Sequence, residues 1–309
     1  MYRSFVLTCV LLCASCAFGQ SAKATRPAIT GISHVTFFAD DLAKSQQFYN
    51  SLLGWEQVPA GTPKSGVHFY ANHLQYVELL SPPSKGLEDR LDSVAFSTSD
   101  AELLRKYLAA HSVKVPPAVK VEPNGDRSFA VRDPEGNKIE FTQAGPNAPK
   151  GGASVSSRVS GHFNHAGYVV RDRATEDRFY KDLLGFHVYW EGGAKPGQTD
   201  WVMMQVPDGT DWLEYMLRLP VHPSRGQLAS ANHFSPGVVT IAELQKKLQQ
   251  NGWVPNAKQS PPLLGVDGKW QYDLADPDGT RVEFMEFLPY KNPCCAPYTG
   301  RQPNPSPAW

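Results

Sequence analysis

The feature that most constrains the fold of this 309-residue chain is an internal repeat. Residues 48–55 read FYNSLLGW, and residues 179–186 read FYKDLLGF. Later in each half, DPEGNKIEF at residues 133–141 matches DPDGTRVEF at residues 276–284. Motifs that recur in the same order along a chain are typical of a tandem duplication, so one module is expected to fold twice.

Each copy also carries a histidine and a glutamate at matching places. His34 and His165 each stand fourteen residues before the phenylalanine that opens the first motif. Glu140 and Glu283 each stand seven residues after the first aspartate of the second motif. The repeat therefore includes residues suited to chemistry as well as residues suited to a core.

The repeats divide the chain into a first module at residues 30–143 and a second module at residues 162–288. Residues 144–161, between them, read AGPNAPKGGASVSSRVSG, and this composition is typical of a flexible linker. Residues 289–309 form a Pro-rich tail that we expect to run extended over the surface. The length of the chain agrees with two domains.

Each module shows the pattern of a strand, a helix and several strands, and shows it twice. In the first unit, residues 32–38 are rich in β-branched and aromatic side chains, which favours a strand. Asp40 or Asp41 can cap the following helix, and Gly54 can end it in a left-handed conformation. The sequence therefore predicts an α+β fold of four βαβββ units, two in each module.

The N-terminal segment has a composition of its own. Arg3 precedes an almost purely apolar run at residues 5–18, and small residues follow two apart. These features predict a cleavable signal peptide at residues 1–19, so we expect export to the periplasm or the exterior. Lipid attachment at Cys16 is the less favoured alternative, because no leucine stands where a lipoprotein signal places one. Beyond this segment, no run is long and apolar enough to span a bilayer.

The charge balance limits the partners that the chain is expected to have, and the cysteine content limits its covalent cross-links. The 30 basic and 30 acidic side chains balance, which gives no reason to expect nucleic acid or an anionic membrane as partner. Outside the signal segment, the cysteines are the adjacent pair Cys294 and Cys295. This pair is expected as two exposed thiols or as a local disulfide, rather than as a metal site. Core burial must therefore hold the fold together.

The last strand of the second module places a glutamate on an unusual face. With the strand period of two, Glu283 shares a face with Arg281 and Met285, opposite Val282 and Phe284. The apolar face is expected to pack on the helices, so Glu283 points to the other side of the sheet. A carboxylate inside a strand is disfavoured unless something there needs it. If the sheet curves, this polar side becomes a concave pocket.

Three further residues complete a candidate metal-ligand set in the second module. His165 lies in its opening strand, Glu214 lies in a strand at residues 211–217, and His233 opens its second half. Each strand that begins or ends a βαβββ unit of this module thus carries one ligand-type side chain. Two imidazoles with one or two carboxylates suit one divalent ion, such as Zn, Fe(II), Mn, Co or Ni. His162, three residues before His165, is expected on the opposite face, at the surface.

The motifs HAGYVV at His165, FYKDLLGF from Phe179 and DPDG before Glu283 resemble those of the vicinal-oxygen-chelate superfamily. That superfamily includes glyoxalase I, type I extradiol dioxygenases, methylmalonyl-CoA epimerase and bleomycin-resistance proteins. The resemblance covers about residues 30–290, and it implies two U-shaped mixed-sheet cups, each built from two βαβββ units around a site on its strands. Carried onto this sequence, it implies the metal ligands His165, Glu214, His233 and Glu283.

The first module departs from this pattern at one position. His34, Glu78 and Glu140 match three of the ligand places, but the second histidine place holds Ser93. The loss of one imidazole leaves a weaker, oxygen-rich set. We therefore expect a degenerate metal site in the first module, which would brace or gate the second. The DPEG and DPDG segments are expected to serve as structural turns.

Three functions fit these residues. The preferred hypothesis is a metal-dependent lyase, isomerase or epimerase. Its small substrate would offer two neighbouring oxygens to the ion. Glu214 or Glu283, with Glu214 preferred, would move a carbon-bound proton of that substrate. The second is an Fe(II) extradiol-type dioxygenase that uses His165, His233 and Glu283, although the segment before Glu283 lacks that group's histidine and aligned tyrosine. The third is a non-catalytic small-ligand binder, against which the presence of both histidines counts. The substrate, the metal and a possible homodimer stay open.

Overall fold

The computed structural model describes residues 25–59, 66–122, 125–146, 156–255 and 259–304. The expected signal peptide and Cys16 lie outside these residues, as do the middle of the expected linker and the last residues of the tail. None of the helices within these ranges is long and apolar enough to cross a membrane.

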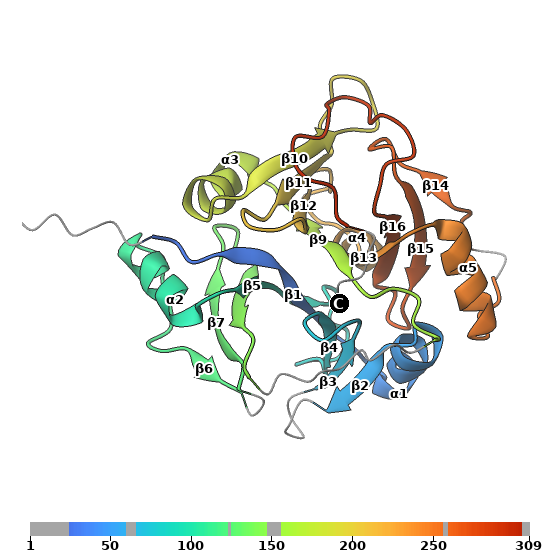
Figure 1. The fold of residues 1–309 in the computed structure, drawn as a ribbon, viewed down its shortest axis with the longest axis horizontal. Helices are drawn as coiled ribbons and strands as arrows, with labels where there is room; N and C mark the ends of the chain where they lie inside the picture. Colours follow the sequence, from blue (N-terminus) through green and yellow to red (C-terminus); the bar gives the residue numbers. More distant parts are fainter. Residues whose placement is uncertain (1–24, 60–65, 123–124, 147–155, 256–258, 305–309) are drawn as a thin grey trace, which may run out of the picture.

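The chain folds into four consecutive βαβββ units, as the sequence predicts (Figure 1). The first unit contains β1 (Ile29–Phe38), α1 (Leu42–Gln46) continued by the π-helical turn η1 (Gln47–Leu52), β2 (Glu56–Pro59), β3 (Val67–Tyr70) and β4 (Tyr76–Leu80). The second contains β5 (Leu91–Thr98), α2 (Ala101–Ala110), β6 (Lys120–Val121), β7 (Arg127–Arg132) and β8 (Lys138–Gln143).

The second module repeats this order. Its first unit contains β9 (Phe163–Val169), α3 (Arg173–Asp177) with η2 (Arg178–Leu183), β10 (His187–Gly192), β11 (Trp201–Gln205) and β12 (Trp212–Met216). Its second unit contains β13 (His233–Val238), α5 (Ile241–Gln250), β14 (Leu263–Leu264), β15 (Trp270–Ala275) and β16 (Arg281–Glu286). A helix that the sequence analysis did not predict, α4 (Arg225–Ala231), connects these two units, and a capping box at Ser224 begins it.

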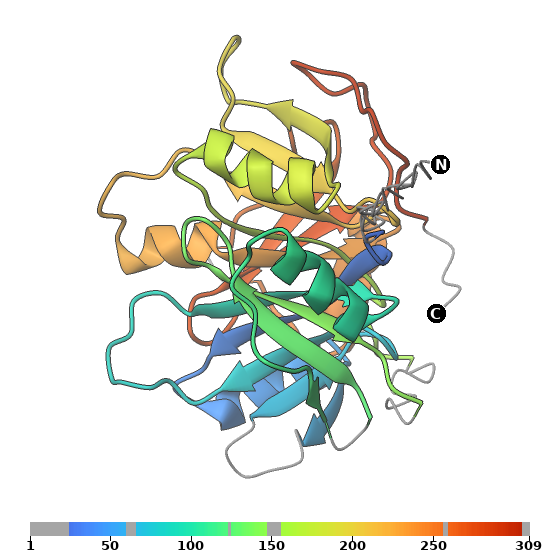
Figure 2. The same cartoon turned by 90° about the vertical axis from the view of Figure 1, so that its left-hand side faces the viewer.

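Each module forms one curled, mixed sheet of eight strands. The strand orders are β2-β3-β4-β1-β5-β8-β7-β6 and β10-β11-β12-β9-β13-β16-β15-β14. The two strands that open the units of a module lie antiparallel at the centre, and each pairs in parallel with the last strand of its own unit. Figures 1 and 2 show the blue-to-green first module beside the yellow-to-red second module. The predicted pair of α+β cups is confirmed.

The repeated FY-LLG motif forms the end of the helical segment in each module's first unit. Asp41, rather than Asp40, caps α1, because its carboxylate accepts hydrogen bonds from the amides of Ala43 and Lys44. The motif begins after α1, in the π-helical turn η1, and the second copy begins in η2. Gly54 follows with φ +68°, and an added Cβ there would lie 2.5 Å from a backbone oxygen of Ser157. Only glycine fits this position.

The two modules share one hydrophobic core. Trp55 of the first module packs its ring against Phe163 and Phe234 of the second, at centroid distances of 5.4 and 6.1 Å. In the reverse direction, Phe186 of the second module makes an edge contact with Phe96 at 5.2 Å. The buried side chains of both modules form one continuous cluster. The helical segment of each module's first unit therefore packs toward the sheet of the other module.

The described end of the expected linker is packed rather than free. Val159 donates its amide to the carbonyl of Leu53, and Ser160 accepts at its carbonyl from the indole of Trp55 at 2.9 Å. Ser160 is 5% exposed. These contacts fasten the start of the second module onto the helix end of the first.

His162 is buried, so its expected place at the surface is wrong. It is 4% exposed, and its Nε2 lies 2.7 Å from Oδ1 of Asp211. His162 precedes β9, so the alternation that places His165 does not govern its side chain. Asp211 also accepts hydrogen bonds from Ile32 and Gln75, so this pair lies where the two modules meet.

Residues 289–304 of the tail contain no helix or strand and bridge the two edges of the second sheet. At one end, the amide of Cys294 donates to Val266, beside β14. At the other, the amide of Thr299 donates to Tyr189 of β10. Of the two forms expected for the cysteine pair, the structure has the disulfide between Cys294 and Cys295. The tail thus crosses the mouth of the second cup, as the dark red segment in Figure 1 shows.

Candidate metal centre

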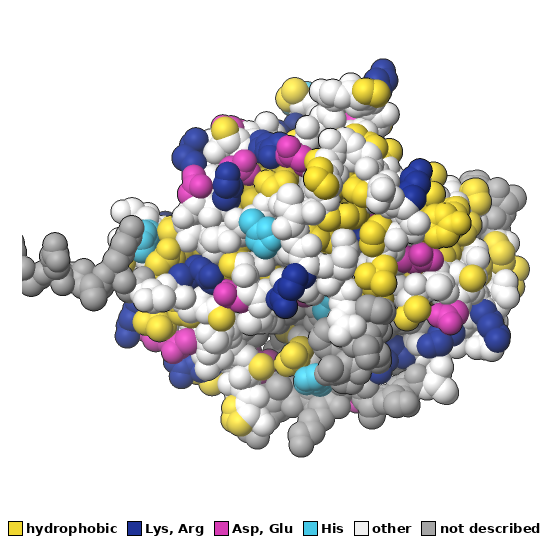
Figure 3. Space-filling model, turned by 45° about the horizontal axis from the view of Figure 1, so that its top comes forward, with side chains coloured by type: hydrophobic (Ala, Val, Ile, Leu, Met, Phe, Trp, Pro, Cys, Tyr) yellow, Lys and Arg dark blue, Asp and Glu magenta, His cyan; other side chains and the backbone are white. Residues whose placement is uncertain are grey.

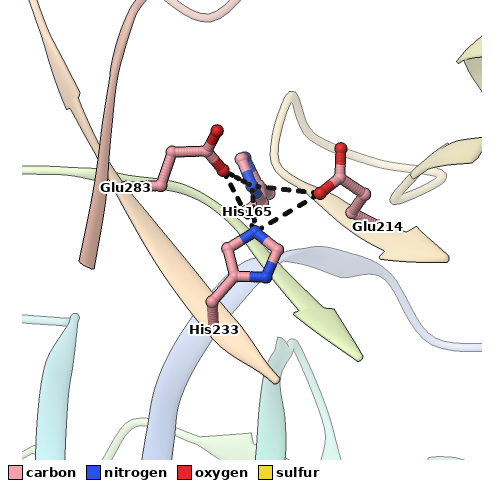
Figure 4. A group of neighbouring side chains, drawn as sticks. All are labelled: His165, Glu214, His233 and Glu283. Carbon is pink, nitrogen blue, oxygen red and sulfur yellow. Dashed lines mark hydrogen bonds and ion pairs between the residues drawn. The ribbon is translucent and has the colours of Figure 1, made fainter. Parts of the chain in front are cut away.

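Four adjacent strands at the centre of the second sheet each contribute one side chain to a common point. These strands are neighbours in the order β12-β9-β13-β16, and their residues are Glu214, His165, His233 and Glu283. Gly167 of β9 lies opposite both Glu214 and His233, which sets the register. Figure 4 shows the four side chains pointing toward one another from the concave side. The structure therefore brings together all four residues that the sequence predicts as ligands.

The donor atoms lie within coordination reach of one ion. His165 Nε2 is 3.1 Å from His233 Nε2, and both lie 3.1–3.2 Å from Oε2 of Glu283. Oε2 of Glu214 is 3.3 Å from His233 Nε2 and 3.7 Å from His165 Nε2. One ligand atom from each residue lies within 4.8 Å of the others, and all four residues are buried.

The hydrogen bonds of His233 orient its imidazole for a cation. Its Nδ1 lies 2.8 Å from the carbonyl oxygen of Ala231, so this nitrogen donates a proton and Nε2 keeps its lone pair. Burial lowers the pKa of His165, which favours the neutral form that binds metal. For His233, burial acts in the same sense, but its contacts with Glu214 and Glu283 outweigh it and raise the pKa. Two imidazoles and two carboxylates at one buried point fit a divalent ion such as Zn, Mn or Fe(II).

Arg281 lies beside this group, and sequence reasoning did not assign it a role. One of its terminal nitrogens lies 2.9 Å from His233 Nε2, and the other lies 3.4 Å from Oε1 of Glu283. Burial alone would raise the pKa of Glu283, but the Arg281 guanidinium together with the imidazoles of His165 and His233 outweighs burial and holds this pKa well below its usual value. The shared strand parity of Arg281 and Glu283 is the signal that could have identified this neighbour.

An aromatic and thioether wall borders the site on the side of β10 to β12. The Trp212 ring stacks on His165 with centroids 4.9 Å apart. Trp212 belongs to a separate buried cluster that is distinct from the main core, and the cluster contains Tyr189, Trp190, Met203, Trp212 and Met285. Trp212 stands two residues before Glu214 and therefore shares its strand face, but sequence reasoning did not predict this wall.

The corresponding residues of the first module make different contacts. Thr36 stands at the register position of Gly167, and its hydroxyl donates to Oε2 of Glu78 at 2.9 Å. Ser93, at the position of His233, donates its hydroxyl to Oε1 of Glu140 at 3.0 Å. Lys138 lies 2.7 Å from the same glutamate. These contacts give both carboxylates partners from within the protein.

Two other features of the first module bear on this comparison. The His34 ring stacks on Tyr76 with centroids 4.5 Å apart, which matches the stacking of His165 on Trp212. A cavity of about 170 Å³ is lined by Ser93 and Lys138 together with Tyr168 of the second module. In the described part of the chain, one group of acidic and histidine side chains lies close enough together to share an ion. It consists of His165, Glu214, His233 and Glu283.

The Asp-Pro turns are structural, as the sequence predicts. Oδ1 of Asp276 accepts hydrogen bonds from the amides of Asp278 and Thr280 and thereby closes the turn before β16. Its Oδ2 accepts from the hydroxyl of Tyr49 at 2.9 Å, which ties the turn to the first module. Asp133 makes the matching turn before β8 through the amide of Asn137.

Comparison with solved structures finds the same architecture in several enzymes. A variant of homoprotocatechuate 2,3-dioxygenase from Brevibacterium fuscum superposes with a TM-score of 0.65 at 18% identity, over 90% of this chain and 75% of that one. The enzyme of that name from Arthrobacter globiformis gives 0.64 at 17%, over 91% and 84%. A Mn(II)-bound glyoxalase from Novosphingobium aromaticivorans gives 0.60 at 19%, over 84% and 83%. At these identities the likeness concerns the fold.

A family comparison of the sequence reaches both modules separately. The family model of the Glyoxalase/Bleomycin resistance protein/Dioxygenase superfamily matches residues 31–141 and again residues 162–284. These two matches cover most of the chain and coincide with the two curled sheets. The chain therefore belongs to the Glyoxalase/Bleomycin resistance protein/Dioxygenase superfamily, with two copies of its module.

Proposed function

We propose that the second module holds one divalent metal ion through His165, Glu214, His233 and Glu283, and that the protein is a metal-dependent lyase, isomerase or epimerase. The observation that carries this proposal is the position of Glu214. Its carboxylate stands as a fourth donor beside both imidazoles, at 3.3 and 3.7 Å. A site with two carboxylates can hold an ion and still spare an oxygen for proton transfer.

The two glutamates differ in how firmly they are held. Glu283 lies about equally close to both imidazoles and also faces the Arg281 guanidinium, so it is suited to remain ionised and hold the ion. Glu214 lies farther from both imidazoles. A bound divalent ion would supply a chelating centre for two neighbouring substrate oxygens and acidify the adjacent C–H group. Glu214 would accept that proton and return it to the substrate, and Trp212 would wall the site from water.

An Fe(II) extradiol-type dioxygenase is the second candidate. The observation in its favour is that His165, His233 and Glu283 form the tighter triangle, with ligand atoms 3.1–3.2 Å apart. Two histidines and one carboxylate on one face leave positions open on a six-coordinate iron. Solved structures of similar fold include homoprotocatechuate 2,3-dioxygenases as well as a glyoxalase.

Proton exchange and oxygen uptake separate the two candidates. The protein would be loaded in turn with Zn, Mn, Co, Ni and Fe(II) and offered hydroxy acids, keto acids, sugars and catechols. We expect solvent deuterium to enter the substrate carbon beside the chelating oxygens, as seen by NMR, without oxygen uptake. The Glu214→Gln variant is expected to lose about 100-fold in exchange rate, whereas Glu78→Gln in the first module keeps the parent rate.

Each other outcome identifies a different function. Oxygen uptake with catechols and iron, unchanged in Glu214→Gln, contradicts the proposal and supports the dioxygenase. Ligand binding without any turnover supports a binding protein. Failure of every ion to bind overturns the metal site itself.

We also propose that the protein acts outside the cytoplasm. The support lies in the N-terminal sequence, where Arg3 precedes the apolar run at residues 5–18. N-terminal sequencing of the protein from cell fractions tests this, with a mature start near residue 20 in an exported fraction as the expected result. An intact N-terminus on cytoplasmic protein would contradict it.

A further inference from the structure

Lys269 is a buried cation on the concave side of the second cup. It directly precedes β15 and is 0% exposed. Its ammonium lies 5.2 Å from the centre of the Trp212 ring, and that ring stacks on His165 at 4.9 Å. One aromatic ring therefore separates Lys269 from the proposed metal centre.

The ammonium of Lys269 is surrounded by aromatic faces rather than by anions. The rings of Tyr189 and Tyr298 lie 5.8 and 5.5 Å from its nitrogen. Its hydrogen bond goes to the carbonyl oxygen of Phe287, at 2.7 Å. An ammonium has three N–H donors, and among the residues that the structure describes no carboxylate forms an ion pair with this one.

Asp267 is near but engaged elsewhere. Its Oδ1 accepts from the backbone amide of Lys269 at 3.2 Å, and the hydroxyl of Tyr298 lies 3.5 Å from its Oδ2. Burial raises the pKa of the Asp267 carboxyl to about 7 and lowers the pKa of the Lys269 ammonium to about 7. A buried ammonium without a close counter-charge is costly, so the protein alone leaves this group incompletely compensated.

A second unused donor lies on the same wall. The indole Nε1 of Trp212 is buried and has no acceptor among the described residues. The wall also contains the thioether side chains of Met203 and Met285, which suit the apolar part of a ligand. Beside the four candidate ligands, the cup thus combines an apolar wall with an ammonium that has one hydrogen-bond acceptor and an indole N–H that has none among the described residues.

The tail closes this corner from outside. The hydroxyl of Tyr298 donates to the carbonyl of Asp267 at 2.8 Å, and its ring covers the Lys269 ammonium. Leu288 and Tyr290, earlier in the chain, are exposed hydrophobic side chains. Figure 3 shows hydrophobic side chains gathered on the right-hand half of the face that it displays. An anion that reaches Lys269 would therefore be held inside the cup, away from bulk water.

We propose that Lys269 binds a carboxylate of the substrate, so that the substrate carries its two chelating oxygens at one end and an anionic group at the other. The inference rests on the proposed metal centre and adds to it the chemical class of the substrate. The carboxylate would accept hydrogen bonds from the Lys269 ammonium and provide a counter-charge closer than Asp267, which lies beyond ion-pair distance. The apolar body would lie against Trp212.

Binding of matched probe pairs to the Zn-loaded protein tests this assignment. One pair is 3,4-dihydroxyphenylacetate and 4-ethylcatechol, and the other is 2-oxoglutarate and 2-oxohexanoate. In each pair the chelating head is kept and the distant carboxylate is removed. Calorimetric titration is expected to show that, in at least one pair, the member with the distant carboxylate binds about tenfold or more tightly than the member without it.

Three variants assign the preference to Lys269. Lys269→Met is expected to reduce the ratio of affinities within that pair to about twofold or less and to leave the affinity of the probe without the distant carboxylate unchanged. Lys269→Arg keeps the charge and is expected to keep a preference for the carboxylate. Lys246→Met, on the exposed face of α5, makes the same change in net charge and is expected to keep the parent ratio.

The outcomes are distinguishable from failure of the metal site. Equal binding within both pairs by the parent, or a preference that persists in Lys269→Met, overturns the assignment. Circular dichroism and Zn content on the same samples show that the variant is folded and loaded. If the parent holds no Zn, the proposed function is wrong, and the same affinity ratios in metal-free protein then decide the role of Lys269 alone.

Discussion

Gly167 determines whether a second imidazole can enter the cup. The ring of His233 packs directly over this glycine, and an added Cβ would lie 2.2 Å from its Cε1. In the first module, Thr36 stands at the corresponding position and faces Ser93. The sites of the two modules therefore differ at two positions rather than one. The side chain of Thr36 fills the space that a histidine in place of Ser93 would need.

Gly167→Ala is expected to displace the His233 imidazole and to weaken metal binding at least tenfold, since one of four ligands loses its orientation. Competition with a chelator measures the change in affinity. Gly226→Ala in α4 is the matched control, because a Cβ there meets no atom within 4 Å. Equal affinities in the two variants would show that the close packing of Gly167 has no part in metal binding.

Glu176 predicts a pH dependence of stability. This residue is 0% exposed, and burial, with the charge of Asp133 adding to it, raises its pKa from 4.5 to about 8. Between these two values the folded state keeps a proton that the unfolded state has lost, so this group makes the protein less stable as the pH rises. An amide in its place would resemble the protonated form.

Glu176→Gln is therefore expected to gain stability relative to the parent between pH 5 and pH 8, by roughly 3 kcal/mol. Urea unfolding of both proteins at the two pH values measures the difference. Glu88→Gln, at an exposed position, removes the same charge and is the matched control. A constant difference between Glu176→Gln and the parent would contradict the predicted pKa.

At the scale of elements, strand alternation is what made the candidate site predictable. The period of two placed Glu283 on a polar face, and the repeat paired His165 with His34. What alternation could not predict lies outside regular strands. His162 precedes its strand, α4 lies in a connection between units, and the π-helical turns add a local irregularity to a motif that predicts an ordinary helix.

The course of the tail was equally beyond sequence reasoning. Its proline content predicts an extended chain but not what the chain covers. The structure shows that Tyr298 and Thr299 reach Asp267 and Tyr189 on opposite edges of the cup. Such contacts depend on the curvature of the whole sheet, which no local pattern encodes.

Removal of residues 289–309 is expected to expose Trp190 and Trp212 and to open the cup. Tryptophan emission should shift to longer wavelength, and a chelator should withdraw metal faster than it does from the full chain. Removal of residues 305–309 alone, which also removes Trp309, is the matched reference for both measurements. If the longer truncation has the emission and metal release of this shorter one, residues 289–304 do not close the cup.

At the scale of the whole molecule, the two modules share a core, so we expect them to unfold as one unit. Trp55 is 0% exposed and packs on Phe163 and Phe234 across the boundary between the modules. A single thermal transition is therefore expected, with equal calorimetric and van't Hoff enthalpies. Trp55→Ala should lower the free energy of unfolding by about 3–5 kcal/mol without splitting the transition. Two separate transitions in the parent would show that the modules fold independently.

The account depends most on one ion being held by the second module. Metal content of the purified, metal-loaded protein measures this directly, for the parent, for His165→Ala and His233→Ala, and for His34→Ala at the matching place in the first module. We predict about one ion per chain in the parent and in His34→Ala, and a large loss in the other two variants. Undiminished metal in both His165→Ala and His233→Ala would contradict the account.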